Sequence, residues 1–161
     1  MTTGFLFADE MDLAGQRVLL RLDVNVPIQD GQVSDDTRIR RIVPGLQALV
    51  AARAKIIILT HFGRPKGKIV PDLSIRPVAN CMTKLLGQTV VVETDVIGAG
   101  GAAAVAALQS GTILRMENLR FYPEEEANDQ CFAKKLAALG DIYIGDAFSC
   151  AHRAHASVDA L

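Results

Sequence analysis

The sequence has little cysteine and no segment that marks export or membrane insertion. Its three cysteines, Cys81, Cys131 and Cys150, form no CxxC pair, which excludes a disulfide framework and a zinc knuckle and favours a reducing compartment. Residues 1–13 contain acidic side chains and lack the basic and long apolar regions of a signal peptide. No later apolar run is long enough to cross a bilayer. We therefore expect a soluble, cytoplasmic protein that does not bind membranes.

An excess of charge of either sign is also absent. Seventeen Lys and Arg residues oppose eighteen Asp and Glu residues, so the formal net charge is -1. Such a chain has no general electrostatic attraction to nucleic acid or to an anionic membrane surface. We expect no nucleic-acid partner, and an anionic ligand must be bound by a local cluster of basic side chains.

The 161 residues suffice for one globular domain, because 50% of them are apolar and 22% are charged. Short, largely β-branched segments predict five strands, over Arg17–Leu22, Lys55–Thr60, Thr89–Glu93, Thr112–Met116 and Asp141–Ile144. Their nearly continuous apolar character is typical of strands that are covered on both faces of a parallel sheet. No internal repeat or low-complexity linker interrupts them.

Helical patterns lie between the predicted strands. We expect helices over residues 37–53, 74–87, 102–108 and 129–139. Asp36 and Ser74 should cap the first two, Gly87 should end the second, and Pro44 with Gly45 should kink the first. Alternating strands and helices imply right-handed βαβ units. The predicted fold class is α/β: a three-layer α/β/α sandwich with a Rossmann-like, mostly parallel sheet of about five strands.

Polar and basic side chains follow four of the predicted strands. In an open parallel sheet, ligands bind outside the carboxyl ends of the strands. Arg38 falls in the first turn of a predicted helix, where a cation opposes the helix dipole and so suggests a bound anion. Because the strand ends share one edge, the four loops favour one shared anionic ligand. The loop residues are Asp23, Asn25, the segment His61–Lys68, Arg120, His152, Arg153 and His155.

Each loop also has a purely structural interpretation. Asp23 and Asn25 are typical of a turn in which Asx side chains bond the backbone before Pro27, and His61–Lys68 can be a solvated basic turn. The acidic run Glu124–Glu126 is expected to be solvated. A nucleotide P-loop is excluded, because Ile69 stands where GxxxxGK requires Ser or Thr.

Two further motifs would imply other chemistry. Residues 98–103 resemble a dinucleotide fingerprint, with Glu117 where a ribose-binding acid belongs, but Asp95–Ile97 separates the glycines from the strand. Cys150, His152 and His155 could hold a metal or form a thiol–imidazole pair, yet the sequence shows no further ligand or second shell. We therefore expect no metal site. A nicotinamide oxidoreductase is kept as an alternative but is not the expected function.

Taken together, the loop sequences resemble those of phosphoglycerate kinase. Five motifs in one order, from Arg17 to Ser157, argue against chance similarity. The resemblance implies a glycolytic transferase with a carboxyl group as acceptor, which interconverts ATP plus 3-phosphoglycerate and ADP plus 1,3-bisphosphoglycerate. The motifs are LLRLDVNVP (19–27), DDTRIRRIVP (35–44), LTHFGRPKG (59–67), LRMENLRFYPEEEAND (114–129) and DAFSCAHRAHAS (146–157).

The resemblance also implies a role for each loop. Asp23 and Asn25 would hold the hydroxyl and carboxyl end of the glycerate, and Arg38 would be the catalytic residue that neutralises charge on the transferred phosphoryl group. His61, Arg64, Arg120 and Arg153 would clamp the 3-phosphate. The implied substrate-binding set is Asp23, Asn25, Arg38, His61, Phe62, Gly63, Arg64, Arg120 and Arg153.

The chain departs from the family pattern in sequence and in length. Gly145 and Ser149 stand where the family usually has Asn and Gly, which bears on the backbone near Arg153. Family members have a carboxy-terminal domain that binds MgATP or MgADP, and residues 1–161 are expected to be part of the amino-terminal domain only. We expect no cofactor in this chain, no turnover by it alone, and self-association through its unfinished sheet. The alternative is a non-catalytic anion-binding or scaffold module.

Overall fold

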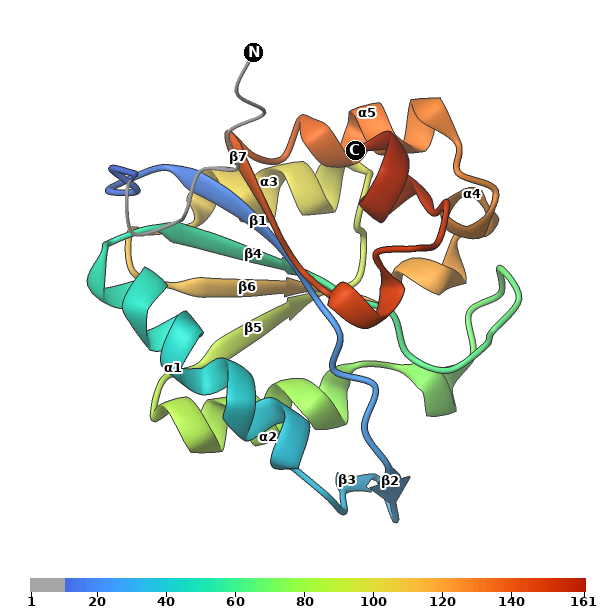
Figure 1. The fold of residues 1–161 in the computed structure, drawn as a ribbon, viewed down its shortest axis with the longest axis horizontal. Helices are drawn as coiled ribbons and strands as arrows, with labels where there is room; N and C mark the ends of the chain where they lie inside the picture. Colours follow the sequence, from blue (N-terminus) through green and yellow to red (C-terminus); the bar gives the residue numbers. More distant parts are fainter. Residues whose placement is uncertain (1–10) are drawn as a thin grey trace.

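The computed structural model describes residues 11–161, and five parallel strands form its main sheet (Figure 1). The strands are β1 (Arg17–Leu22), β4 (Lys55–Leu59), β5 (Val90–Glu93), β6 (Ile113–Met116) and β7 (Ile142–Asp146). Their spatial order is β5-β6-β4-β1-β7, and each agrees with a predicted strand to within two residues at either end. Because all pairings are parallel, the five carboxyl ends lie along one edge of the sheet.

Helices cover both faces of the sheet. The four longest are α1 (Thr37–Ala51), α2 (Arg76–Leu86), α3 (Ala99–Ala107) and α5 (Gln130–Ala137). Figure 1 shows α1 and α2 on one face and α3 and α5 on the other. Ile56 and Ile58 of β4 belong to the first core and Ile57 and Leu59 to the second, which explains the continuous apolar runs and confirms the three-layer fold. No helix of the described residues is long and apolar enough to cross a membrane.

The start of α1 differs from the predicted cap. Asp36 precedes the helix, but its carboxylate accepts a hydrogen bond from Arg40 Nε at 2.8 Å instead of capping the backbone. Asp35 instead satisfies the first N–H of the helix, because its Oδ1 accepts from the Thr37 backbone N–H at 2.9 Å. The helix then continues through Pro44 to Ala51.

The ends of α2 lie close to their predicted positions. Ser74 stands one residue before the N-cap position, and its hydroxyl accepts from the Arg76 N–H at 3.3 Å. Gly87 ends the helix with φ of 65°, the left-handed conformation that glycine adopts without a steric penalty.

A short antiparallel hairpin between β1 and α1 was not predicted. It consists of β2 (Ile28–Gln29) and β3 (Gln32–Val33). Asp30 and Gly31 form its turn with φ of 51° and 72°. An Asp-Gly pair between short strands is the usual sequence signal for such a turn, so this hairpin could have been predicted from the sequence.

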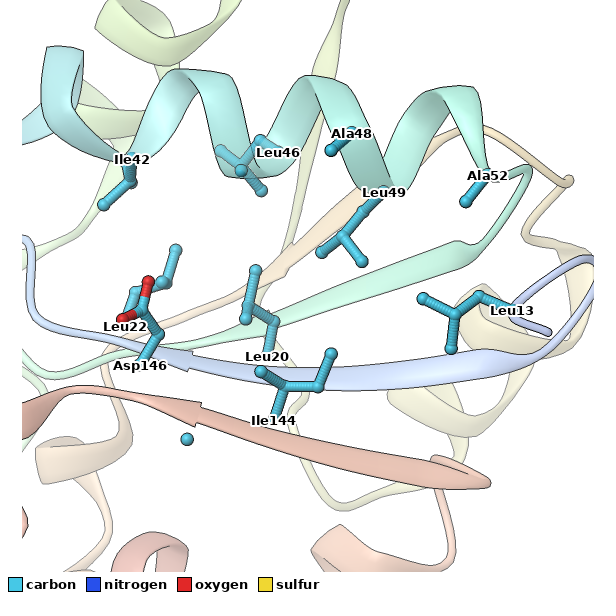
Figure 2. Close-up of a pocket in the computed structure, with 12 residues that line it drawn as sticks. Leu13, Leu20, Leu22, Ile42, Leu46, Ala48, Leu49, Ala52, Ile144 and Asp146 are labelled. Atoms are coloured by element: carbon cyan, nitrogen blue, oxygen red, sulfur yellow. The ribbon is translucent and has the colours of Figure 1, made fainter. Parts of the chain in front are cut away.

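Strand β7 lies at the edge of the described sheet, where β1 is its one partner among residues 11–161. A hollow of about 550 Å³ separates it and β1 from α1. Figure 2 shows Leu20, Leu22, Leu46, Leu49 and Ile144 directed into this hollow. Leu46 and Leu49 of α1 line this hollow and are nevertheless buried.

A fully buried arginine lies in β6. The Arg115 guanidinium donates to Thr60 Oγ1 at 2.9 Å and contacts Met82 Sδ at 2.8 Å, and its Nε has no hydrogen-bond partner among the described residues. Burial lowers the pKa of Arg115 to about 9, while the negative charge of Glu117 raises it. The side chain is therefore charged at pH 7 without a carboxylate in contact, an arrangement that opposes folding.

We expect Arg115→Leu to stabilise the chain by about 1–3 kcal/mol at pH 7, because an apolar side chain avoids the desolvation of a buried cation. Urea denaturation at pH 7 measures the effect. Arg76→Leu, at an exposed position of α2, is the control, and a destabilised Arg115→Leu chain would contradict the prediction.

Candidate functional site

The loops that carry the predicted site residues meet at the carboxyl edge of the sheet. Arg38 Nη1 lies 3.4 Å from Asp23 Oδ2, and Arg120 Nη1 donates to the Gly63 carbonyl at 2.8 Å. Asn25 Oδ1 accepts from the Gly63 N–H at 3.4 Å. The structure thus joins the segments after β1, β4 and β6, which are far apart in the sequence.

Asp23 is the acidic member of this cluster. Its Oδ1 accepts from the Asn25 N–H at 3.2 Å, which forms the predicted Asx turn, and its Oδ2 accepts from the Ser149 hydroxyl. Burial raises the pKa of Asp23, but the hydrogen bonds from Ser149 and Asn25 outweigh it and lower the pKa below its usual value. Asp23 is therefore a carboxylate at neutral pH, which can accept hydrogen bonds from a hydroxyl group and from Arg38.

The segment His61–Lys68 exposes its basic side chains Arg64, Lys66 and Lys68, but part of it is packed against the protein. His61 and Phe62 are buried, and the Phe62 side chain belongs to the apolar core, so that only its backbone is available at the loop. Gly67 has φ of 71°, and a Cβ there would approach Pro123 Cβ at 2.7 Å. The loop therefore packs tightly against the segment after β6.

The Asn118 side chain holds this loop in place through hydrogen bonds, a role that the sequence did not indicate. Its Oδ1 accepts from the N–H groups of Phe62 and Arg120, both at 3.1 Å. Its Nδ2 donates to the carbonyls of Phe62 and Leu73 at 2.7 and 2.9 Å. All hydrogen-bonding atoms of this fully buried amide are thus in use. The sequence showed only that Asn118 follows a strand.

Glu117 attaches the start of α2 to the end of β6. Its carboxylate accepts from the Ser74 hydroxyl at 2.7 Å, the Ile75 N–H at 2.9 Å and the Asn118 N–H at 2.8 Å. A ribose hydroxyl would have to compete with these donors for the Glu117 oxygens. Glu117 therefore has a structural role near the site.

Arg120 is a buried cation whose hydrogen bonds are incomplete. Its side chain is 5% exposed, and within residues 11–161 its Nε and Nη2 atoms have no hydrogen-bond partner. Glu126 Oε1 lies 3.8 Å from Nε, which is too far for a hydrogen bond. Burial lowers the pKa of Arg120, and the nearby Glu126 raises it. Buried N–H groups of a guanidinium normally have acceptors, so these atoms point to an anionic ligand.

His61 lies beside Arg120 and is neutral at pH 7. Its Nδ1 is 2.9 Å from Arg21 Nη2. Burial lowers the pKa of His61 to about 3, and the positive charges of Arg21, Arg120 and Arg153 act in the same direction. His61 can therefore donate a hydrogen bond to a phosphate but adds no charge.

The two remaining predicted phosphate ligands are exposed. Arg153 lies in the loop after β7, and its positive charge lowers the pKa values of His61, Arg120 and His155, which places it near these groups. Arg64 is exposed in the loop after β4, and no hydrogen bond among the described residues joins it to the cluster. Both side chains are accessible to a ligand.

The acidic run Glu124–Glu126 is only partly solvated, contrary to expectation. Glu125, in the short helix α4 (Pro123–Glu126), is fully buried and accepts from the Ser157 N–H at 3.0 Å and from the Ser157 hydroxyl. The prediction was wrong for this residue, because tertiary packing brings Ser157 against α4.

The glycine-rich start of α3 does not form a dinucleotide site. Asp95 already occupies the helix N-terminus, where its carboxylate accepts from the Gly98 N–H at 3.0 Å and the Gly100 N–H at 2.8 Å. A pyrophosphate would need these same N–H groups. The oxidoreductase alternative therefore has no phosphate site in this segment.

Cys150 contacts His61 and is not part of a metal cluster. Its Sγ lies 3.8 Å from His61 Nε2, while His152 is exposed. Within residues 11–161, no three His, Cys, Asp or Glu side chains gather closely enough to hold a metal ion.

Comparison with known proteins assigns the chain to a family. A family model described as "Phosphoglycerate kinase" matches residues 8–161. The chain belongs to the phosphoglycerate kinase family. It is 53% identical over 158 residues to the phosphoglycerate kinase of Ruegeria sp., covering 98% of this chain and 40% of that protein. It is 54% identical over 147 residues to the enzyme of Synechococcus elongatus, covering 91% of this chain and 37% of that protein.

Solved structures of phosphoglycerate kinases have the same fold. The enzyme from Coxiella burnetii matches with a TM-score of 0.85 at 36% identity, over 96% of this chain and 38% of that chain. The enzyme from Pyrococcus horikoshii matches with a TM-score of 0.87 at 30% identity, over 97% of this chain and 40% of that chain. The chain thus spans about 40% of the length of the phosphoglycerate kinases that it matches.

Ser149, one of the two departures from the usual phosphoglycerate kinase pattern, contacts the site directly. Its hydroxyl donates to Asp23 Oδ2, which connects the loop after β7 with the loop after β1. Gly145, the other departure, lies in β7, and a Cβ there would approach the Tyr143 ring at 3.3 Å. Of these two residues, Ser149 is the one that affects the site, because its hydrogen bond lowers the pKa of Asp23.

Proposed function

We propose that this chain is part of the amino-terminal domain of a phosphoglycerate kinase and that it binds 3-phosphoglycerate or 1,3-bisphosphoglycerate at the carboxyl edge of the sheet. The observation that carries the proposal is the buried Arg120 guanidinium, two of whose nitrogens find no hydrogen-bond partner in the part of the chain that the structure describes. A phosphate group is dianionic and accepts several hydrogen bonds, so it matches this donor better than water does.

The arrangement of the other side chains favours phosphoglycerate over a simple anion. Arg120, Arg64, Arg153 and the neutral His61 would bind the 3-phosphate, with the backbone of Phe62 and Gly63 beside them. Asp23 and Asn25, joined to the same loop through Gly63, would bind the hydroxyl and carboxyl end of the glycerate. A ligand with both a phosphate and a hydroxy acid therefore uses both parts of the cluster.

Arg38 would act on the group that is transferred. Its side chain is 57% exposed and lies 3.4 Å from Asp23 Oδ2, so it is held by one carboxylate and is otherwise accessible. A cation near the acyl oxygen can stabilise negative charge on a phosphoryl group in transit. In the whole protein the reaction would be ATP plus 3-phosphoglycerate giving ADP plus 1,3-bisphosphoglycerate, a cytoplasmic step of glycolysis.

The nucleotide would be bound elsewhere in the whole protein. Neither candidate phosphate loop of this chain fits MgATP or MgADP, because Ile69 replaces the magnesium-binding hydroxyl and Asp95 occupies the start of α3. The 161-residue chain should thus bind phosphoglycerate without phosphoryl transfer. A coupled assay that detects turnover by this chain would contradict this part of the proposal.

An NMR titration of the ¹⁵N-labelled chain with 3-phosphoglycerate tests the binding function, with sulfate and glycerate as controls. We expect selective amide shifts at Asp23, Arg38, residues 61–64, Arg120 and residues 152–153. Equal responses to sulfate and 3-phosphoglycerate would instead favour the non-catalytic anion-binding or scaffold module. An unshifted spectrum would mean that the site is not assembled in this chain.

We further propose that the isolated chain associates with a second copy of itself through β7. Among the described residues this strand pairs only with β1, it lies beside the apolar hollow under α1, and two identical edges can pair. Sedimentation velocity should show a mass that rises with concentration. Ile42→Lys, in the hollow, should suppress the association, while Val91→Lys, 54% exposed on the opposite edge strand, should not. A monomer at every concentration would refute the proposal.

A further inference from the structure

Arg21, in β1, is a fully buried arginine that no predicted role includes. Its Nε donates to Ser157 Oγ at 2.9 Å, and its Nη1 donates to the Leu22 carbonyl at 2.7 Å. Its Nη2 lies 2.9 Å from His61 Nδ1. The guanidinium is therefore held in one orientation, with one N–H directed at the imidazole.

This contact fixes which nitrogen of His61 carries the proton. A guanidinium has only donors, so His61 Nδ1 must be the acceptor and cannot itself carry hydrogen. The proton of a neutral imidazole then lies on Nε2. That nitrogen faces the loop after β7, where Cys150 Sγ lies 3.8 Å away. In a doubly protonated His61 ring, the Nδ1–H would point at an N–H of Arg21. This repulsion disfavours the charged imidazole.

We propose that Arg21 is a positioning residue of the phosphoglycerate site: it holds His61 in the neutral, Nε2-protonated tautomer, so that the Nε2–H is presented to the bound phosphate. The part of this proposal that concerns phosphate rests on the proposed function. The part that concerns the tautomer rests on the Arg21–His61 contact alone.

The surroundings of Arg21 keep it in place. Ser157 accepts from Arg21 Nε and donates its hydroxyl to the buried carboxylate of Glu125. Tyr143 donates its hydroxyl to the Ser157 carbonyl at 2.9 Å. The segment Ala156–Ala160 thus acts on His61 through Arg21, although Ser157 lies 136 residues further along the chain than Arg21.

The charged groups around His61 keep the ring uncharged. Burial and the positive charges of Arg21, Arg120 and Arg153 lower the pKa of His61, and the nearby Asp23 carboxylate only partly opposes them. The hydrogen bond from His61 to a phosphate should therefore be constant between pH 5 and 8, unlike that of an ordinary histidine with a pKa of about 6.5. The arginines of the site, and not His61, would therefore neutralise the charge of the phosphate.

The tautomer can be read directly in the ligand-free chain. Long-range ¹H–¹⁵N spectra of the labelled imidazoles should show His61 with a protonated Nε2 and an unprotonated Nδ1, unchanged from about pH 5 to 8. A protonated Nδ1, or a titration near the ordinary pKa of histidine, would overturn the proposal. This measurement needs no variant and no ligand, so it is independent of the proposed function.

Variants of Arg21 separate a positioning role from a purely structural one. Arg21→Met should let His61 populate both tautomers and should weaken 3-phosphoglycerate binding by about 10-fold. Arg21→Lys, which retains a donor, should restore the wild-type tautomer in part. Arg17→Met, in the same strand but paired with Asp141 at 2.7 Å, is the matched control. An unchanged His61 spectrum in a folded Arg21→Met chain would refute the role of Arg21.

Discussion

Replacing Arg120 by methionine is expected to weaken the binding of 3-phosphoglycerate by about 100-fold or more. Two charge-assisted hydrogen bonds from a buried guanidinium to a phosphate are each worth about 1.5–3 kcal/mol, and 1.4 kcal/mol is tenfold in affinity. Arg120 is suited to this role because its Nε and Nη2 are buried and find no partner among residues 11–161.

The fold should tolerate this change. Methionine fills much of the same volume and removes a buried, incompletely bonded cation, so the loss of the bond to the Gly63 carbonyl is offset. Isothermal titration calorimetry measures the affinity, and circular dichroism reports folding. Arg40→Met, which alters an exposed arginine of α1 paired with Asp36, should bind like the wild type. Unchanged affinity in Arg120→Met would place the phosphate elsewhere.

Replacing Asn118 by alanine is expected to destabilise the chain by about 4 kcal/mol, because four buried backbone groups lose their partners at about 1–3 kcal/mol each, with incomplete additivity. These groups are the Phe62 N–H and carbonyl, the Arg120 N–H and the Leu73 carbonyl. Since two of the segments carry phosphate-site residues, the same change should also reduce binding in the fraction that stays folded.

Urea denaturation of Asn118→Ala, followed by circular dichroism, measures the loss of stability. Asn80→Ala removes the same kind of side chain from an exposed position of α2 and should change stability by less than about 0.5 kcal/mol. Asn118→Asp keeps both acceptor contacts but turns an oxygen toward two carbonyls, so it should be destabilised as well. A wild-type midpoint for Asn118→Ala would show that water replaces the amide without loss.

The layered fold could be predicted because its signals are local. Each strand is a short β-branched run, and the strand in Lys55–Leu59 is buried on both faces because its neighbours are also strands with helices above and below. Gly87 was placed correctly, since a left-handed helix end depends on the glycine itself. The hairpin at Asp30–Gly31 also had a local signal, although it was not predicted.

The sequence-based predictions were wrong where neighbouring residues of the same type could each make the same local contact. Asp35 and Asp36 both precede α1, and the sequence does not say which carboxylate reaches the helix N-terminus and which reaches Arg40. Glu125 was expected in solvent with the two glutamates beside it, yet it alone is fully buried. Such choices are decided by small differences in backbone direction and by packing partners that lie far along the chain.

The sequence by itself determined the strands, most of the helices, and which loops carry basic side chains, because these follow from the order of apolar and polar residues. Tertiary structure alone decided that Asn118 fastens the His61 loop, that Arg120 is buried with free donors, and that Arg21 bonds His61. These contacts join residues that are tens of positions apart. Their geometry depends on how the helices pack on the twisted sheet, which sets distances that no local pattern encodes.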